Sequence, residues 1–365
     1  MDSKKIVFVI NSIKQARCVR RVEEFIERGY QVDAYGFDRE GDHRALPNIP
    51  LTVVGTFQNG TNYFNRLRDI RSAIKNNIAN KYNPEDTIFY LFNLDVVLAF
   101  RSAFGKKYKY IYEVSDLAEL VVGNPLIRKF LIWQNYQSMK NAFHVVFTSE
   151  GFCDFYNRIP QEQISVIPNK ISTNCPKVEI ISRALNPEHI KIGFVGIIRF
   201  ETVLNFAKVC SRNKTIDFHL FGMISNGDEY ALELEKLAKN TRNITLHGPF
   251  KSPIDLPSIY EDIDMVLSAY PPTPGVIYAE PNKLYEAIYF RCPIIVNQGT
   301  FLGRKVKRLN VGYVIDAMSE SNIQSFLDGI CADAYLDKVK ACQAIPQVEC
   351  LNINDVFFEK LKSLC

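Results

Sequence analysis

Three polar side chains stand just before a buried-looking apolar run in the second half of the chain. Asn282, Lys283 and Glu286 occupy the stretch AEPNKLYEAIYFRCPIIVNQG, residues 279–299. Pro281 suits the first turn of a helix, so Asn282 and Lys283 should project at its positive end, where an ammonium can meet a diphosphate. Glu286 lies one turn further along, where a carboxylate can accept both hydroxyls of a ribose. The alternative without a function is an exposed Lys–Glu pair, which stabilises a helix by only a few tenths of a kcal/mol.

A second candidate phosphate site lies at a strand-to-helix turn. The segment GFVGIIR, residues 193–199, closes a predicted strand. Its small residues, Gly196 among them, would let backbone N–H groups approach an anion at the start of the next helix. Arg199 would add a bidentate phosphate partner. A tight turn with no ligand is the alternative, because the segment is not GxGxxG and no acidic residue completes a dinucleotide fingerprint.

In the first half, two carboxylates stand at the end of a predicted strand, Glu113 and Asp116 in YIYEVSDLAEL. A carboxylate there could act as the general base that deprotonates an attacking hydroxyl, with Asp116 as first candidate and Glu113 as reserve. Asp116 could equally cap the following helix. Arg17 could neutralise a phosphate on donor or acceptor, or could be a solvated arginine at a helix end.

No pattern predicts a metal or a cofactor. Asp262 and Asp264 form a DxD, but they lie between a short helix and a strand, where Asp264 is a usual turn acid. His144 and His219 lie in apolar strand runs and are predicted core histidines. The nine cysteines show no CxxC spacing, so neither a zinc site nor a secreted disulfide framework is indicated. A reducing cytosol is the simplest setting.

These residues must be positioned by α/β architecture. The 365 residues suffice for two domains, and 47% hydrophobic with 23% charged residues is a globular composition. Apolar strand-like runs alternate with helical stretches, which indicates parallel sheets covered on both faces. The predicted strands of the first half are KIVFVIN, VDAYGF, LTVVGTF, TIFYLFN, YKYIYEVSD and HVVFTSE. Those of the second half are IKIGFVGII, DFHLFG, NITLHG, IDMVLSAY, CPIIVN and VGYVID.

The predicted domains are an N-terminal domain over 1–170 and a C-terminal domain over 189–345. The polar segment PNKISTNCPKVEIISRALNPEH at 168–189 contains three prolines and suggests a linker over 171–188. Residues 346–365 are predicted to form a C-terminal helix that could cross back to the N-terminal domain. Two doubly wound domains of this kind would face a central cleft lined by strand ends and helix N-termini, where such sheets bind ligands.

The charge is uneven along the chain. The net charge is +4, and residues 1–180 hold 24 Lys and Arg against 19 Asp and Glu. That excess of +5 is too small to predict nucleic-acid binding, and no run approaches the roughly 18 apolar residues of a spanning helix. Basic and apolar residues nevertheless alternate in two stretches, 63–75 and 124–140. Such a surface could rest on an anionic leaflet, although core packing also accounts for many of the apolar residues.

The order of several motifs resembles that of glycosyltransferases of the GT-B fold, most closely family 4 and its bacterial polysaccharide relatives. The motifs are VIPNKI at 166–171, IGFVGIIR at 192–199, FHLFG at 218–222, NITLHGPF at 243–250, YEDIDMVL at 260–267 and PNKLYEAIYFRCPIIV at 281–296. At the N-terminus, QARCVRRVEEFIERGYQVDAYGF resembles the family's opening helix and second strand. The resemblance implies two Rossmann-like domains, the first on the acceptor side and the second binding a nucleotide sugar.

By this resemblance Arg199 and Lys283 would hold the diphosphate and Glu286 the ribose, with Gly196 and Asn282 beside them. The base would lie against the backbone around Phe221, Gly222, Met223, Phe250 and Lys251. One position departs from the family pattern. Retaining members usually carry two glutamates separated by seven residues, and here Tyr278 stands at the first of these positions, with Glu280 two residues out of register. Retention or inversion therefore stays open.

The activity implied is transfer of a sugar, without a metal, from a nucleoside-diphosphate sugar to a hydroxyl of a lipid-linked glycan. Such an enzyme would serve bacterial surface-polysaccharide or capsule synthesis, in the cytoplasm or peripherally on the inner face of the plasma membrane. A nucleotide-sugar epimerase of the same fold is one alternative, although the carboxylate or histidine pair it needs is not located. A non-catalytic nucleotide-sugar-binding scaffold subunit is another, suggested by the missing first glutamate.

Overall fold

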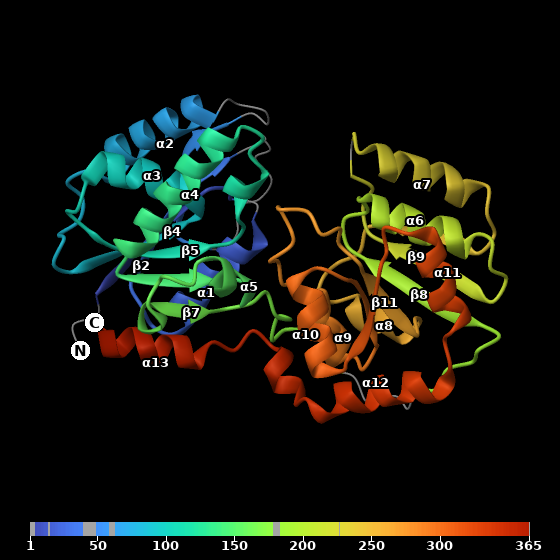
Figure 1. Cartoon of the computed structure of the whole chain (residues 1–365). Coiled ribbons are helices and arrows are strands. Elements are labelled where there is room, and N and C mark those ends of the chain that lie inside the picture. The colour runs from blue at the N-terminus through green and yellow to red at the C-terminus, as the bar shows by residue number, and fades with distance from the viewer. Residues whose placement is uncertain are drawn as a thin grey trace. The chain divides into compact units, whose positions relative to one another are not determined.

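The computed structural model describes residues 4–13, 15–38, 49–57, 63–177, 183–225 and 227–364, without the side chains of Tyr63 and Phe64. The chain divides into two compact units (Figure 1). Unit 1 consists of Met1–Ile167 and Asp355–Cys365, and unit 2 consists of Pro168–Asn354.

Unit 1 is built on a seven-stranded sheet in the order β3-β2-β1-β4-β5-β6-β7. Every pairing between these neighbours is parallel. The strands are β1 (Lys5–Ile10), β2 (Val32–Asp38), β3 (Leu51–Thr56), β4 (Thr87–Phe92), β5 (Lys109–Val114), β6 (His144–Phe147) and β7 (Ile164–Val166). β4 is buried along its whole length, as expected for a strand covered on both faces.

Helices cover both faces of this sheet. On one face Phe8 and Tyr90 share a core with Phe25 of α1 (Ala16–Glu27) and Phe358 of α13 (Asp355–Leu364). On the other face the ring of Phe89 lies 4.7 Å from that of Phe100. That face carries α2, α3 and α4, which pack on one another in this order. The remaining elements of unit 1 are α2 (Tyr63–Ile78), α3 (Asn93–Phe104), η1 (Ala118–Val121), α4 (Pro125–Lys140), α5 (Gly151–Phe155) and η2 (Gln161–Gln163).

Unit 2 is built on a six-stranded parallel sheet in the order β10-β9-β8-β11-β12-β13. Its strands are β8 (Ile190–Val195), β9 (Ile216–Phe221), β10 (Ile244–Gly248), β11 (Met265–Ser268), β12 (Ile294–Asn297) and β13 (Gly312–Ile315). In chain order this is the 3-2-1-4-5-6 arrangement of doubly wound nucleotide-binding sheets, whose strand order reverses between β8 and β11. Ligands of such sheets bind at the carboxyl ends of the strands beside that reversal.

Two apolar cores cover the two faces of this sheet. One contains Phe206 and Phe218 and the other contains Tyr260 and Leu284. The helices are α6 (Glu201–Cys210), α7 (Glu229–Lys239), α8 (Leu256–Glu261), α9 (Lys283–Tyr289), α10 (Phe301–Leu309), α11 (Glu320–Asp328), α12 (Ala332–Ala344) and the 3-10 turn η3 (Gln347–Cys350).

The predicted pair of doubly wound α/β domains is confirmed, with differences in detail. β7, which has only three residues, was not predicted from the sequence. Residues 346–365 are not one helix, because η3 is followed by the separate helix α13, which belongs to unit 1. Residues 178–182 of the predicted linker lie outside the described residues, and its described remainder belongs to unit 2. Within the described part of the chain, every helix is too short or too polar to cross a membrane.

Candidate functional site

The loops that follow β8, β9 and β10 are held together by backbone hydrogen bonds. Gly196 N–H donates to the Phe221 carbonyl (2.8 Å), and Gly222 N–H donates to the Gly248 carbonyl (2.7 Å). Gly222 has a φ of 141°, and a Cβ there would lie 1.7 Å from the Gly196 oxygen. Only glycine permits this approach. The predicted turn at Gly196 and the predicted base-binding backbone at 221–223 are therefore parts of one compact surface.

Lys283 begins α9, a seven-residue helix that is buried throughout. The residue is 6% exposed, and Nζ lies 3.0 Å and 2.8 Å from the two carboxylate oxygens of Glu286. A Cβ on Gly196 would lie 3.9 Å from Lys283 Cε, so the lysine stem passes beside the loop after β8. The alternative of an exposed Lys–Glu pair is therefore wrong, because both partners are buried. An ammonium with three donors and one carboxylate partner keeps a donor for a further anion.

Glu286 is held by three donors. Besides Lys283, Asn282 Nδ2 donates to Oε1 (2.6 Å) and the Tyr260 hydroxyl donates to Oε2 (2.7 Å). Asn282 precedes α9 in a helical conformation, and its side chain bonds Glu286 instead of capping the helix. Tyr260, on α8, was not singled out from the sequence, where it only begins the motif YEDIDMVL. The ribose-binding role of Glu286 stays a prediction. The hydroxyls of a ribose would have to donate to the carboxylate that already accepts from Lys283, Asn282 and Tyr260.

Arg199 is exposed after β8, with its guanidinium 4.5 Å from the centre of the Phe200 ring. Phe200 has a φ of 78°, which a non-glycine residue adopts only at a cost of about 1–3 kcal/mol. The Phe200 ring meets that of Tyr270 edge-on at 5.4 Å. Burial raises the pKa of Tyr270, Arg199 lowers it and Glu286 raises it further, so both charges act on one hydroxyl. Tyr270 was not predicted as a site residue either. Its position just after the apolar strand run at 263–268 could have indicated that it lies at the carboxyl end of the sheet.

The structure thus pairs Lys283 with Glu286 at the start of α9, beside the loop that follows β8, and Arg199 lies in that same loop. Besides burial, the charges of Arg199 and Glu286 both shift the pKa of Tyr270, which follows β11. The residues that follow β8 and β11 lie at the sheet edge at which a doubly wound sheet binds phosphates.

The other residues predicted to bind substrate in unit 2 have varied settings. Met223 is exposed, whereas Phe250 is half-buried against the apolar core and Tyr278 is half-buried. Lys251 is exposed, and its backbone N–H already donates to Asp255 Oδ2 (2.7 Å).

Glu280, the glutamate out of the family register, is buried as well. Lys305 Nζ donates to its Oε1 (2.6 Å), as does the Tyr285 hydroxyl. The two acids of the DxD both bind Lys191 of β8. Asp262 pairs with Lys191 Nζ (2.6 Å), and Asp264 accepts the Lys191 backbone N–H (2.8 Å). His144 is buried as predicted, whereas His219 is only half-buried and lies 2.9 Å from His247.

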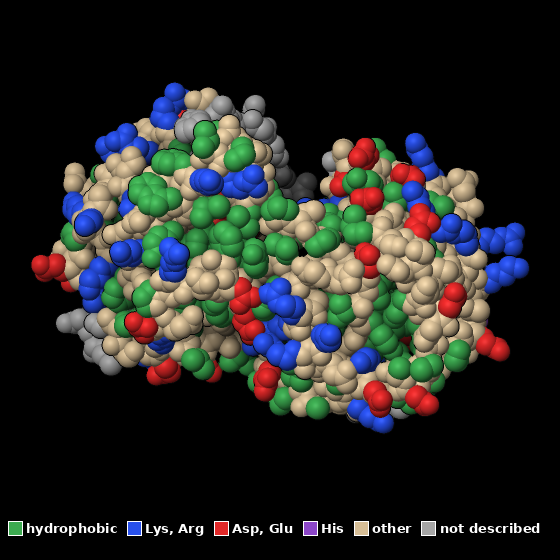
Figure 2. All heavy atoms as spheres, viewed as in Figure 1, with side chains coloured by type: hydrophobic (Ala, Val, Ile, Leu, Met, Phe, Trp, Pro, Cys, Tyr) green, Lys and Arg blue, Asp and Glu red, His purple; other side chains and the backbone are tan. Residues whose placement is uncertain are grey.

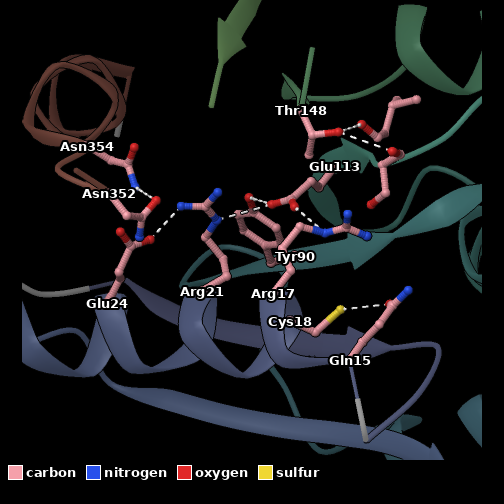
Figure 3. A network of polar contacts seen from close by, with 12 residues as sticks. Gln15, Arg17, Cys18, Arg21, Glu24, Tyr90, Glu113, Thr148, Asn352 and Asn354 are labelled. Carbon is pink, nitrogen blue, oxygen red and sulfur yellow. Dashed lines mark hydrogen bonds and ion pairs between the residues drawn. The ribbon is translucent and has the colours of Figure 1, made fainter. Parts of the chain in front are cut away.

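In unit 1 the structure corrects two expectations. Glu113 does not face an acceptor, because its side chain is fully buried between β5 and α1 (Figure 3). Arg21 Nε lies 3.1 Å from Oε2, Arg17 Nε lies 3.5 Å from Oε1, and the Tyr90 hydroxyl donates to Oε2. Arg17 is therefore an ion-pair partner of Glu113 that ties α1 to the sheet, not a solvated arginine.

Asp116 remains exposed, and the cap of the following 3-10 helix is Leu117, without a side-chain hydrogen bond. The alternative in which Asp116 caps that helix is therefore wrong. Asp116 lines a groove of about 1790 Å³ in unit 1, which we call the α3–α4 groove. The groove has seven basic side chains against four acidic ones. The basic residues are Arg66, Arg68, Arg71, Arg101, Lys106, Lys107 and Lys109, and the acidic residues are Glu85, Asp95, Asp116 and Glu119.

Exposed apolar side chains lie on η1 and α4, and those of Ile127 and Phe130 also line the groove. Figure 2 shows hydrophobic and basic side chains mixed over the face of unit 1 that carries α2, α3 and α4 in Figure 1. We call the exposed set the α4 patch. It comprises Val121, Leu126, Ile127, Phe130 and Trp133, which are 42–78% exposed.

Comparison with known proteins gives structural neighbours only. No protein-family model and no curated protein sequence matches the chain. Among solved structures it is similar to sucrose-phosphate synthase from Thermosynechococcus elongatus, with a TM-score of 0.74 and 13% identity over 99% of this chain and 100% of that one. It is also similar to HepE from Anabaena in complex with UDP and glucose, with a TM-score of 0.65 and 14% identity over 99% and 100%.

A third similar structure is the lipopolysaccharide outer core galactosyltransferase WaaB, with a TM-score of 0.65 and 12% identity over 99% of this chain and 98% of that one. At these identities the likeness concerns the fold. The two doubly wound units and the full-length match to these neighbours show that the chain has the GT-B fold.

Proposed function

We propose that the protein is a glycosyltransferase that moves a sugar from a nucleoside-diphosphate sugar to a hydroxyl of a lipid-linked glycan, in bacterial surface-polysaccharide synthesis. The observation that carries this proposal is the buried Lys283–Glu286 pair beside the loop that follows β8, the loop that also bears the exposed Arg199. A solved neighbour of the same fold binds UDP and glucose, and another is a galactosyltransferase, which supports the same class of donor.

In the proposed reaction the acceptor oxygen forms a bond to the anomeric carbon as the bond from that carbon to the diphosphate breaks. The leaving diphosphate gains negative charge. Arg199 is exposed and can bind it bidentately, while Lys283 contributes its remaining donor. Glu286 holds the Lys283 ammonium in position. In an inverting reaction the proton of the acceptor hydroxyl would pass to Asp116, an exposed carboxylate of the α3–α4 groove.

The α3–α4 groove supports an amphipathic, anionic acceptor. It exceeds the roughly 300–1,000 Å³ of small-molecule pockets, its basic side chains outnumber its acidic ones, and the apolar α4 patch adjoins it. A glycan carried on a lipid phosphate combines these properties. We further propose that unit 1 rests on an anionic leaflet through the α4 patch and its neighbouring lysines and arginines.

The donor assignment is tested through Arg199, because this exposed side chain can be removed without disturbing the core. UDP, GDP and their sugars should raise the melting temperature of the wild-type protein, since a ligand that binds the native state stabilises it. Arg199→Ala should lower nucleotide affinity at least tenfold at unchanged melting temperature without ligand. Arg212→Ala removes another exposed arginine of unit 2 and should have no effect.

The activity is tested by following release of nucleoside diphosphate. Release that requires an added acceptor supports transfer. Conversion of the donor alone into an epimer would establish the epimerase instead. If the protein binds the nucleotide sugar but releases no nucleoside diphosphate with any acceptor tested, the result would support the non-catalytic scaffold role. Wild-type affinity for nucleotides in Arg199→Ala would contradict the site itself.

A further inference from the structure

Three polar atoms at the carboxyl ends of β4 and β5 are left without a hydrogen-bond partner in the described part of the chain. They are Asn93 Oδ1, Ser115 Oγ and Glu119 Oε2, and each exposes less than 1 Å². Asn93 follows β4 and the other two follow β5, which are neighbouring strands. Buried polar atoms are normally satisfied, so a group of unsatisfied ones needs an explanation.

Glu119 is fixed so that only one of its oxygens is used. Oε1 accepts from Asn135 Nδ2 (2.8 Å) and from the Tyr156 hydroxyl. Asn135 is in turn oriented by the Tyr112 hydroxyl, which donates to its Oδ1 (2.8 Å). The side chain is 2% exposed, and no ion pair to it occurs among the described residues. A buried carboxyl that is oriented by neutral groups and keeps one oxygen unused is typical of a binding site.

Asn93 carries a second sign of function. Its φ is 63°, a left-handed conformation that costs energy for a residue other than glycine, and it opens α3 directly after β4. Asparagine tolerates this conformation better than most residues. Asn93 and Glu119 both line the α3–α4 groove, and the unused oxygen of each is buried.

The chemistry of the missing partner follows from these atoms. Asn93 Oδ1 can only accept, and so can Glu119 Oε2 when its carboxyl is ionised, so the ligand must donate. An ammonium would donate, but the groove already carries seven basic side chains against four acidic ones and disfavours a cation. Neutral hydroxyl groups remain. Two acceptors in one groove, beside the exposed carboxylate of Asp116, suit a ligand with several hydroxyls.

We propose that Asn93 and Glu119 form a hydroxyl-recognition subsite for a sugar ring in the α3–α4 groove. Asn93 Oδ1 and Glu119 Oε2 each accept a hydroxyl proton of the ring, after a small side-chain rotation that uncovers them. The subsite rests on the proposed function in one respect, that the ring belongs to the acceptor glycan. Both residues are binding residues, and Asn135 and Tyr156 position the carboxyl.

Trp133 provides the assay, because it is the only tryptophan of the chain and lies on α4, next to the groove-lining Phe130 with ring centres 6.1 Å apart. Its fluorescence would be titrated with octyl glucoside, galactoside, mannoside and N-acetylglucosaminide below their micelle concentrations. Octyl triglycol carries the same chain without a ring and reports binding of the chain alone. We expect at least one glycoside to bind more tightly than octyl triglycol.

Two variants remove the acceptors. In Glu119→Gln the amide oxygen must serve Tyr156 and Asn135, so the amide nitrogen takes the place of Oε2 and donates instead of accepting. Asn93→Gly removes Oδ1 but keeps a backbone that adopts positive φ freely. Each should weaken binding of the preferred glycoside about tenfold, the usual effect of losing one such hydrogen bond. Binding of octyl triglycol should be unchanged.

Glu85→Gln is the matched control, since it removes an exposed acid of the same groove that has no buried, unused oxygen. It should bind the glycoside like the wild type. Unchanged affinity in both Glu119→Gln and Asn93→Gly would overturn the proposal, as would a wild type that binds no glycoside better than octyl triglycol. UDP binding is measured on the same proteins and decides the donor site separately.

Discussion

At the residue scale, the lysine and glutamate of α9 work as one buried unit. Lys283 and Glu286 are 6% and 2% exposed, and each is the other's charged partner. Removing one partner of a buried pair leaves the other charge without compensation, which costs about 3–5 kcal/mol. An activity loss in Lys283→Ala would therefore mix chemistry with stability. Arg199 is the cleaner probe because it is exposed.

This coupling can be measured with a double-mutant cycle. Lys283→Met and Glu286→Gln should each lower the free energy of unfolding by about 3 kcal/mol. The double variant should lose clearly less than the sum of the two, because no uncompensated charge remains buried. Urea unfolding of the four proteins gives the coupling directly. Additive losses would mean that the two charges do not depend on each other, contrary to the 2.8 Å contact.

The roles of single residues could be predicted from the sequence only in part. Lys283 and Glu286 were found because they stand one turn apart before an apolar run. Their burial was not foreseen, since α9 packs into a core of residues distant in sequence, among them Tyr260, which donates to Glu286. Glu113 was misplaced for a similar reason. Its partners Arg17 and Arg21 lie about 90 residues earlier, and no local pattern shows that they meet it.

At the element scale, apolar runs predicted the strands well because parallel strands buried on both faces need no polar residues. β7 was missed because three residues form too short a run. Sequence pattern also identified His144 as a core residue, and the structure shows what holds it. His144 lies on β6, 2.9 Å from the Ser165 hydroxyl on β7, so the imidazole links the edge strand β7 to its neighbour.

That link predicts a pH dependence of stability. Burial, and secondarily Lys360, lowers the pKa of His144 from 6.5 to about 4. Between these values the unfolded chain binds a proton that the native protein does not. The contribution of His144 is therefore complete above pH 6.5 and is lost as the pH falls toward 4, by up to about 3 kcal/mol.

The variant His144→Gln can keep a hydrogen bond to Ser165 and cannot titrate. Urea midpoints at pH 7.5, 5.5 and 4.5 should therefore fall less steeply for the variant than for the wild type. Comparing the two proteins removes the contribution of every other titrating group. Parallel pH profiles would show that His144 is free to take up a proton in the native state.

At the scale of the whole molecule, composition and strand order were enough to predict two doubly wound units, and the full-length neighbours share this fold. The α3–α4 groove could not be predicted. Its walls come from α2, α3, η1, α4 and several strand ends, and its unused acceptors become visible only when every other hydrogen bond is known. The excess of basic residues in the first half was visible in the sequence. The sequence did not show that seven of these side chains line one groove.

The α4 patch and the basic residues within it lead to a prediction about membrane binding. The α4 patch exposes five large apolar side chains on one short stretch, and Arg128 and Lys129 lie within it. Apolar insertion and attraction to anionic lipid should act together, with about 1 kcal/mol for each basic residue near the surface. The protein should bind vesicles of phosphatidylglycerol and phosphatidylethanolamine more tightly than vesicles of phosphatidylcholine. Because Trp133 lies in the patch, its emission should shift to the blue on binding.

A pair of variants separates the two contributions. Leu126→Glu/Phe130→Glu should abolish the blue shift, whereas Arg128→Gln/Lys129→Gln should weaken binding about tenfold or more and remove most of its dependence on salt. Val356→Glu introduces a charge at an exposed apolar residue on α13, outside the patch, and serves as the control. If the first variant binds anionic vesicles with an unchanged emission shift, the patch is not the contact. Self-association that the same variant removes, without vesicle binding, would assign the patch to a second copy of the chain.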